Sequence, residues 1–226
     1  MAYMMFTSSE DKDNLNSRLE GGNPRAPTAD TVAPDGAPRK GQPISGCFMD
    51  SMRVPEQLLV SVPQRIIVTP CADGFIADFA KASDYMTYIV SDRFVDIVER
   101  LEPGVHEFLP IAQAVDDKGH PLARRFFLLN VLTRLAAIDV ERSTVERKDM
   151  SFEFEGKRFE SIMLAESPGP INTRGFVARK KVIAGHHLWR GNKDGLMGRY
   201  FCSSRLHDEM QAAGLSQFWF VPMDEF

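Results

Sequence analysis

Two stretches of the chain repeat one pattern of hydrophobic and polar positions. Residues 88–111 and 200–223 align without a gap at an offset of 112 positions. Each begins with a short apolar run that ends in a serine, Ser91 or Ser203, and such a serine can cap a helix by accepting a bond from a free backbone N–H. Six positions carry the same residue in both copies: Tyr88 and Tyr200, Ser91 and Ser203, Arg93 and Arg205, Asp96 and Asp208, Phe108 and Phe220, Pro110 and Pro222.

The residues after each serine have the spacing of an amphipathic helix. Apolar residues recur three and four positions apart, which places them on one stripe: Phe94, Val98 and Leu101 in the first copy, Leu206, Met210 and Ala213 in the second. A glycine follows each helix, Gly104 or Gly214, and an apolar strand closes each copy. We therefore predict a strand–helix–strand unit used twice, at residues 86–111 and 198–223, with both helices on a shared sheet. The alternative is that the two stretches are unrelated and merely have similar capping and turn residues.

Strand patterns dominate the rest of the chain. Two strand-like runs, Leu58–Val62 and Ile66–Thr69, are separated by Pro63. The cluster at residues 116–119 predicts a hairpin turn, and residues 126–139 read as a buried strand, with periodicity leaving a following helical turn open. A better hairpin spans residues 150–164, where a Gly156-Lys157 turn would pair Phe154 with Phe159. Strands outnumber helices in mixed order, which predicts a single α+β domain with mixed sheets.

Residues 1–43 are predicted to be a disordered or loosely attached tail before a domain at residues 44–226. Residues 7–43 contain five prolines and almost no aliphatic periodicity. Such a segment buries too little apolar area to offset the conformational entropy that folding costs.

Composition narrows the class of protein. The chain has 226 residues, 43% of them hydrophobic, which is enough for one large domain or two small ones. The formal net charge of −4 argues against a general nucleic-acid binder, so no direct nucleic-acid contact is expected. No apolar run approaches the roughly 18 residues of a membrane helix, and the first residues do not resemble a secretory signal. With three scattered cysteines, Cys47, Cys71 and Cys202, a cytoplasmic protein with reduced thiols is the simplest account.

Histidine and cysteine offer only weak candidates for chemistry. His186 and His187 are the only histidine pair, but neighbours on a strand point to opposite faces, and the nearest carboxylate is Asp194 in a loop. Cys202 precedes a helix N-cap, where a helix terminus can lower a thiol pKa, although a buried thiol is the favoured interpretation. We therefore predict no metal, no cofactor and no catalytic residue.

Glycine and charged clusters have plain structural interpretations. Gly191, Gly195 and Gly198, with Lys193 and Arg199 nearby, favour an ordinary turn over a phosphate-binding loop. The basic residues between positions 174 and 190 favour a solvated strand edge over a site for an anionic partner; they are Arg174, Arg179, Lys180, Lys181 and Arg190. Asp139 and Arg142 can pair as a cap, with Ser143 starting the next element, and a catalytic Asp139 or Glu141 has no supporting partner.

The order of these patterns resembles a known family. It comprises a helix led by Ser91, an FLPI strand, an FFLLNV strand with Leu129 and Asn130, an I-D-x-E-R-S element, and a final Y-F-x-S-x-x-L-H-D-x-M-x-x-A-G-L-S-x-F-x-F-x-P-M segment. The pattern is similar to immunity-protein family eleven of bacterial polymorphic toxin systems, over roughly residues 84–226. The positions that carry the resemblance are core and cap residues: Ser91, Leu129, Asn130, Asp139, Arg142, Ser143, Ser203, Leu206, Gly214 and Phe220.

The resemblance implies a cytoplasmic protein that binds and neutralises a toxin encoded beside it. It brings no catalytic residue, and which residues touch the toxin is not predicted. The mild acidity fits a basic toxin, because an acidic inhibitor is steered to such a target. The alternative hypothesis is a small cytosolic hydrolase or transferase with a site assembled from His187, Asp194 and Cys202, which a deep pocket with perturbed pKa values would favour. A third hypothesis is a nucleic-acid-linked regulator that uses residues 174–190.

Overall fold

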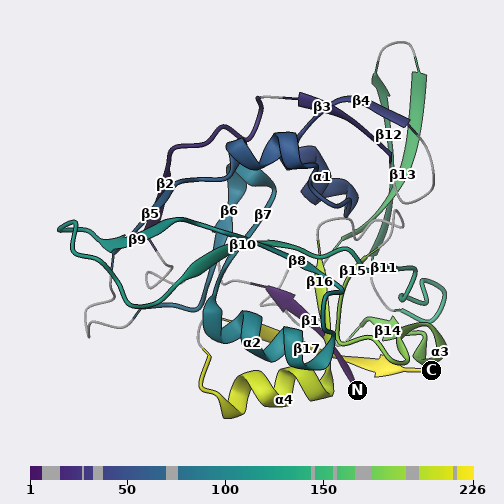
Figure 1. The fold of residues 1–226 in the computed structure, drawn as a ribbon. Helices are drawn as coiled ribbons and strands as arrows, with labels where there is room; N and C mark the ends of the chain where they lie inside the picture. Colours follow the sequence, from purple (N-terminus) through teal and green to yellow (C-terminus); the bar gives the residue numbers. More distant parts are fainter. Residues whose placement is uncertain are drawn as a thin grey trace. The chain divides into compact units, whose positions relative to one another are not determined.

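The computed structural model contains helices and mixed sheets, so the predicted α+β class is confirmed (Figure 1). It describes residues 1–6, 16–26, 28–32, 38–69, 76–143, 146–154, 157–165, 175–191, 199–215 and 218–226. Contacts divide the chain into two compact units: unit 1 comprises Met1–Phe6, Thr133–Asp208 and Phe220–Phe226, and unit 2 comprises Thr7–Leu132 and Glu209–Trp219. None of the helices in the described ranges is both long and apolar enough to cross a membrane.

Unit 2 is built around a four-stranded antiparallel sheet. Its strands, in spatial order, are β6 (Phe79–Ala82), β7 (Thr87–Ser91), β10 (Phe126–Asn130) and β8 (Glu107–Pro110). Side chains alternate between its two faces. On one face, Phe79 and Phe108 lie against Phe94 of helix α2 (Asp92–Leu101). On the other face, Ile89 and Leu128 join the main core cluster of the unit.

Smaller elements of unit 2 complete its main core cluster. They are helix α1 (Ile44–Asp50), the 3-10 helices η1 (Glu56–Ser61) and η2 (Ser83–Tyr85), the three-stranded sheet of β2 (Asn16–Glu20), β5 (Arg65–Thr69) and β9 (Gln113–Asp116), and the hairpin of β3 (Thr28–Val32) and β4 (Pro38–Pro43). Phe48, Leu58 and Ile66 carry α1, η1 and β5 into the cluster, and each is fully buried. Figure 1 shows α1 and α2 on opposite sides of the four-stranded sheet.

Unit 1 is built around a six-stranded mixed sheet. Its strands, in spatial order, are β11 (Arg134–Leu135), β15 (Leu188–Gly191), β16 (Tyr200–Ser203), β1 (Ala2–Phe6), β17 (Trp219–Glu225) and β14 (Val177–Ala178). Met4, Trp189 and Phe201 lie in its core with no exposed surface. The short helix α3 (Lys180–Ile183), helix α4 (Ser204–Ala212) and the hairpin of β12 (Glu146–Phe154) and β13 (Lys157–Ala165) complete the elements, and the boundary between the units falls within α4.

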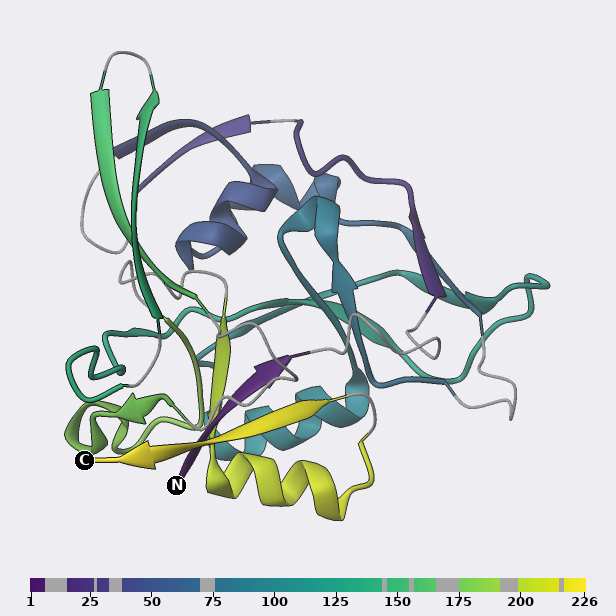
Figure 2. The ribbon, with the colours of Figure 1, turned by 180° about the vertical axis from the view of Figure 1, so that it is seen from behind.

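The predicted repeat is present, but its two copies do not share a sheet. β7–α2–β8 and β16–α4–β17 are both strand–helix–strand units. β10 lies between β7 and β8 in one sheet, and β1 lies between β16 and β17 in the other, as Figure 2 shows for the strands near the N-terminus. In both copies a strand from elsewhere in the chain occupies the place beside the first strand, so each copy completes a separate sheet.

The first 43 residues also differ from the predicted tail. β1, β2, β3 and β4 all lie within them, and β1 pairs antiparallel with β16, with Met4 opposite Phe201. Local pattern could not reveal β1 or β2, because their partners β16 and β5 lie far along the chain. Residues 7–15, 27 and 33–37 lie outside the described ranges.

Other predicted elements are partly corrected. Residues 58–62 were expected to be a strand, but η1 occupies most of them, whereas the strand predicted at Ile66–Thr69 is present as β5. The turn predicted at 116–119 is present: the Gly119 N–H donates to the Asp116 carbonyl, and Val115 pairs antiparallel with Pro121 across the turn. The pairing is a single bridge, and the strands on either side, β9 and β10, belong to different sheets. The hairpin of β12 and β13 is present with Phe154 opposite Lys157, which shifts the predicted register by two residues.

Candidate functional site

The serine at each helix start caps it as predicted. The Ser91 hydroxyl oxygen accepts from the Phe94 N–H at 3.4 Å, and the Ser203 hydroxyl oxygen accepts from the Leu206 N–H at 3.2 Å. The glycines after the two helices, Gly104 and Gly214, have φ of 68° and 61°, the left-handed region that glycine adopts at least cost. The three family-pattern residues among these four, Ser91, Ser203 and Gly214, therefore have structural roles.

Ser91 also belongs to a buried charge cluster that the sequence did not predict. Its hydroxyl donates to Oδ1 of Asp78 at 2.7 Å, and Asp78 has no exposed surface. Arg93 and Arg124 reach the same carboxylate at 3.2 Å and 3.4 Å. Two guanidinium groups and a hydroxyl compensate the burial of the charge, so the cluster fastens the start of α2 to the segment before β6.

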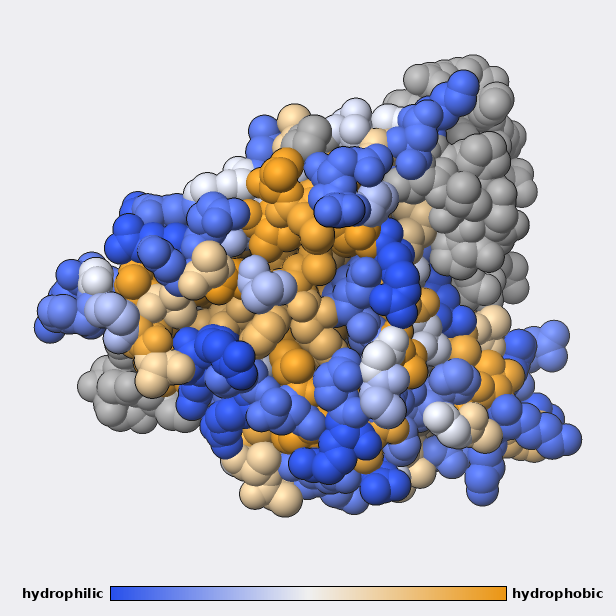
Figure 3. All heavy atoms as spheres, viewed as in Figure 1, coloured by the Kyte–Doolittle hydropathy of each residue, from blue (hydrophilic) through white to orange (hydrophobic). Residues whose placement is uncertain are grey.

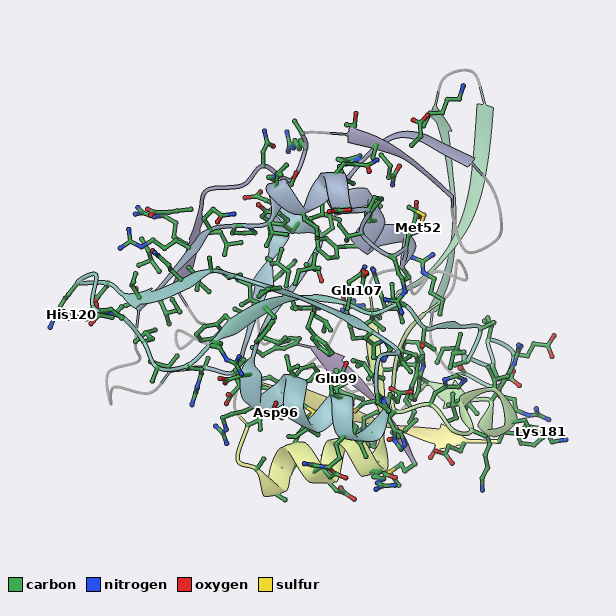
Figure 4. All side chains as sticks on the ribbon, viewed as in Figure 1. Met52, Asp96, Glu99, Glu107, His120 and Lys181 are labelled. Carbon is green, nitrogen blue, oxygen red and sulfur yellow. The ribbon has the colours of Figure 1, made fainter. Side chains whose placement is uncertain are left out.

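Asn130 is the centre of a second buried polar cluster. Its Nδ2 donates to the Met52 carbonyl and to Oε2 of Glu107, both at 2.7 Å, and the Val54 N–H donates to the same carboxylate at 3.0 Å. Figure 4 labels Met52 and Glu107, which come from the end of α1 and the start of β8. The neighbouring Leu129 is fully buried. The cluster thus holds the chain after α1 to the four-stranded sheet.

A histidine–carboxylate pair lies between α2 and β8. Nε2 of His106 is 3.1 Å from Oε2 of Glu102, and Nδ1 of His106 accepts from the Leu132 N–H at 3.3 Å. The accepting role of Nδ1 places the ring proton on Nε2, which then donates to the carboxylate. Because the His106 side chain has no exposed surface, the pair reads as a structural contact.

The I-D-x-E-R-S element forms a tight cap in unit 1. Oδ1 and Oδ2 of Asp139 accept from the Arg142 N–H and guanidinium, both at 3.2 Å, and the Ser143 hydroxyl donates to the Asp139 carbonyl at 2.6 Å. Burial alone would raise the pKa of Asp139, but the bonds from Arg142 and the charges of Arg142 and Arg179 outweigh it and lower the pKa. Arg142 in turn lies over the Phe226 ring. Glu141 is exposed.

The histidine and cysteine residues considered as candidates for chemistry have structural surroundings. Nδ1 of His187 is 2.8 Å from the Ser203 hydroxyl oxygen, so this histidine supports the cap of α4. Burial raises the pKa of the Cys202 thiol well above its ordinary value, and the charge of Asp208 adds to the increase, which opposes thiolate formation. Burial likewise raises the pKa of Cys47 to about 11. Asp194 and Cys71 lie outside the described residues.

The basic residues between positions 174 and 190 do not form one strand edge. Arg179 precedes α3, and Lys180 and Lys181 are exposed in its first turn, so this run is helical where a strand edge was predicted. Arg190 is buried in β15, with its guanidinium 5.1 Å from the centre of the Tyr200 ring. Gly191 is also buried in β15, while Arg174, Lys193, Gly195 and Gly198 lie outside the described residues.

Phe220 is part of a small aromatic cluster in unit 1. Its ring meets the rings of Tyr3 and His207 edge-on, with centroids 6.2 Å and 4.6 Å away, and Tyr3 stacks on His207 at 4.1 Å. The cluster joins β17 and β1 to the start of α4. This family-pattern residue therefore packs the sheet of the second strand–helix–strand unit.

One region of unit 2 exposes large apolar side chains on η1 and directly after η2, two elements that the hydrogen bond from Tyr85 to Ser61 joins. We call it the η-patch and define it by Leu59, Val60 and Met86, which are 41%, 68% and 52% exposed. Figure 3 shows apolar side chains gathered over α1 and the strands beside it. Sequence reasoning missed this surface, because Leu59 and Val60 were read as part of a strand, and an apolar residue alone does not reveal its exposure.

In the polar clusters described above, the family-pattern residues hold parts of the fold together. Among the described residues, none of the side chains form a group of three or more that is placed to hold a metal ion. Comparison with known families identifies the chain more closely. Residues 34–225 match the Immunity protein family (Imm11), and the chain belongs to this family. None of the curated proteins compared with it matches significantly.

Proposed function

We propose that this protein neutralises one cognate toxin of a polymorphic toxin system by binding it directly. Membership of the Immunity protein family (Imm11) over residues 34–225 carries the proposal, because an immunity role implies a toxin partner. In this account the protein acts in the cytoplasm, where it protects the producing cell during competition between bacteria.

The polar family-pattern residues support a binding function. Ser91 and Ser203 cap helices, Asn130 fastens α1 to the sheet, and Asp139 closes a turn. Each of these side chains forms its hydrogen bonds within the protein itself, so the family-pattern residues favour a rigid fold. A rigid surface binds a partner with little ordering cost, which is what an inhibitor acting by contact requires.

Co-expression with the neighbouring reading frames tests this proposal. Each neighbour is expressed alone and together with the tagged full-length chain, and growth and co-purification are measured. We expect one neighbour to stop growth alone, to be tolerated with this chain, and to co-purify with it in a fixed ratio. A toxin from an unrelated system serves as the control that should remain lethal and unbound.

The proposal is overturned if the toxic neighbour is neutralised without forming a complex, or if none of the neighbours is toxic. Neutralisation without a complex would point to chemistry on the toxin or its target. That result would return attention to a site assembled from distant residues, the hydrolase or transferase alternative.

A further inference from the structure

We propose that the η-patch is the surface that docks the toxin, and that the toxin meets it with an apolar centre surrounded by basic side chains. This inference rests on the proposed function and names the contact surface for it. The argument uses three independent features of the patch: its anchoring in the core, the backbone conformation of one member, and the charge around it.

The η-patch is anchored so that its side chains project from a fixed platform. Its members follow Leu58 and Tyr85, which are buried in the same core cluster as Phe48 of α1. The Tyr85 hydroxyl donates to the Ser61 carbonyl at 2.8 Å and so ties η2 to the end of η1. Docking on such a platform sacrifices little backbone freedom, and fixed, desolvated apolar anchors dominate the affinity of protein interfaces.

The backbone of Met86 has an unfavourable conformation. Its φ is 56°, in the left-handed region that disfavours side chains other than those of glycine, asparagine and aspartate. The same side chain is half exposed, so packing inside the molecule does not account for a methionine at this position. An asparagine would suit the backbone better and would expose no apolar surface. A strained position with an exposed apolar side chain is a signature of function.

Carboxylates border the patch on the same elements. Glu56 begins η1 and Asp84 lies in η2, and both are exposed. Unit 2 as a whole carries 19 acidic and 13 basic residues, a formal charge of −6, whereas unit 1 carries 12 acidic and 14 basic residues, a formal charge of +2. The net negative charge of the chain therefore comes from the unit that bears the patch. An apolar centre with an acidic border is complementary to a basic protein surface.

Binding measurements on full-length variants test the η-patch. The probe is the toxic partner recovered by co-purification with the wild-type chain, and titration gives its Kd for each variant. Val60→Ser and Met86→Asn together are expected to raise the Kd about tenfold or more. Val105→Ser is the matched control, because Val105 is also an exposed valine of unit 2 but lies in the turn after α2. It should change the Kd less than about twofold.

Thermal unfolding of the same variants separates docking from folding. Met86→Asn is expected to keep or raise the melting temperature, because asparagine accepts the left-handed conformation, and it should still weaken binding. Glu56→Lys should slow association more than Asp96→Lys, since Asp96 is on α2, across the four-stranded sheet from α1 (Figure 4).

The outcomes distinguish this inference from the proposed function. If the wild-type chain recovers a toxic partner and the double variant binds it with an unchanged Kd, the η-patch inference is overturned and the proposed function stands. The inference also fails if Val105→Ser weakens binding as much as the double variant does. If the wild-type chain forms no complex at all, the proposed function itself fails.

Discussion

At the scale of single residues, the polar family-pattern positions are those where the backbone needs a partner. A helix leaves its first N–H groups without an acceptor, which is why a serine after an apolar run predicted the caps at Ser91 and Ser203. The same reasoning could not find Asp78, because its partners Arg93 and Arg124 lie 15 and 46 positions later in the chain. Local hydrogen bonding can be read from sequence, whereas a buried ion pair depends on the folded arrangement.

The two serine caps are expected to differ in their contribution to stability. Replacing Ser203 with alanine removes the cap bond and the bond to the partly buried His187, and should lower the free energy of unfolding by about 1–2 kcal/mol. Replacing Ser91 also removes a hydrogen bond to the buried Asp78 carboxylate, which adds about 1–3 kcal/mol. Urea unfolding followed by circular dichroism measures both variants. Equal losses would mean that the Ser91–Asp78 bond contributes no more to stability than the Ser203–His187 bond.

Asp139 should make the stability of unit 1 depend on acid pH. Its pKa is lower in the folded protein than the ordinary value of 3.8, so it favours folding above that value. This contribution disappears as the pH falls through the folded pKa, because the protonated carboxyl loses its pairing with Arg142. Asp139→Asn should therefore flatten the decline in stability between about pH 4 and pH 2. Urea titrations at several pH values measure the slope for the wild-type chain and for Asp139→Asn, and equal slopes would contradict the role of Asp139.

At the scale of elements, sequence predicted those whose signals are local. The alternation and turn residues around position 156 predicted a hairpin, but the register differs because the strands end at Phe154 and resume at Lys157. In that register the backbone position of Glu153 lies opposite that of Arg158. Both strand–helix–strand units were predicted as well. The separate sheets of the two units were not predicted, because β10 and β1 come from elsewhere in the chain and lie between the first and last strands of each unit.

β1 is expected to be essential to unit 1. It lies between β16 and β17 and contributes Ala2 and Met4 to the core with no exposed surface. Deleting residues 1–6 should strongly lower the melting temperature, whereas a loosely attached tail would leave it unchanged. A milder variant, Met4→Ala, should cost about 2–5 kcal/mol. Met86→Ala replaces an exposed methionine and serves as its control, with a change within about 0.5 kcal/mol. Unchanged unfolding of the deletion variant would contradict the role of β1.

At the scale of the whole molecule, the net negative charge and the exposed apolar residues of the η-patch both belong to unit 2. Total composition concealed this, since −4 is the sum of −6 and +2 on units whose segments alternate along the chain. Three segments of the chain form unit 1 and two form unit 2, so a window along the sequence mixes the two surfaces. The contact surface for a partner therefore could not be predicted before the fold assigned each segment to its unit.

Electrostatic steering by unit 2 gives a prediction for the intact protein. If the toxin presents a basic surface, the association rate constant should fall steeply as salt rises, because mobile ions screen charges over about 10 Å at 0.1 M. The dissociation rate should change much less, since desolvated apolar anchors hold the complex once it has formed. Surface plasmon resonance between about 50 and 500 mM sodium chloride separates the two rates. An association rate that does not depend on salt would exclude a basic docking surface. Salt dependence confined to the dissociation rate would mean that ion pairs, and not the apolar centre, hold the complex together.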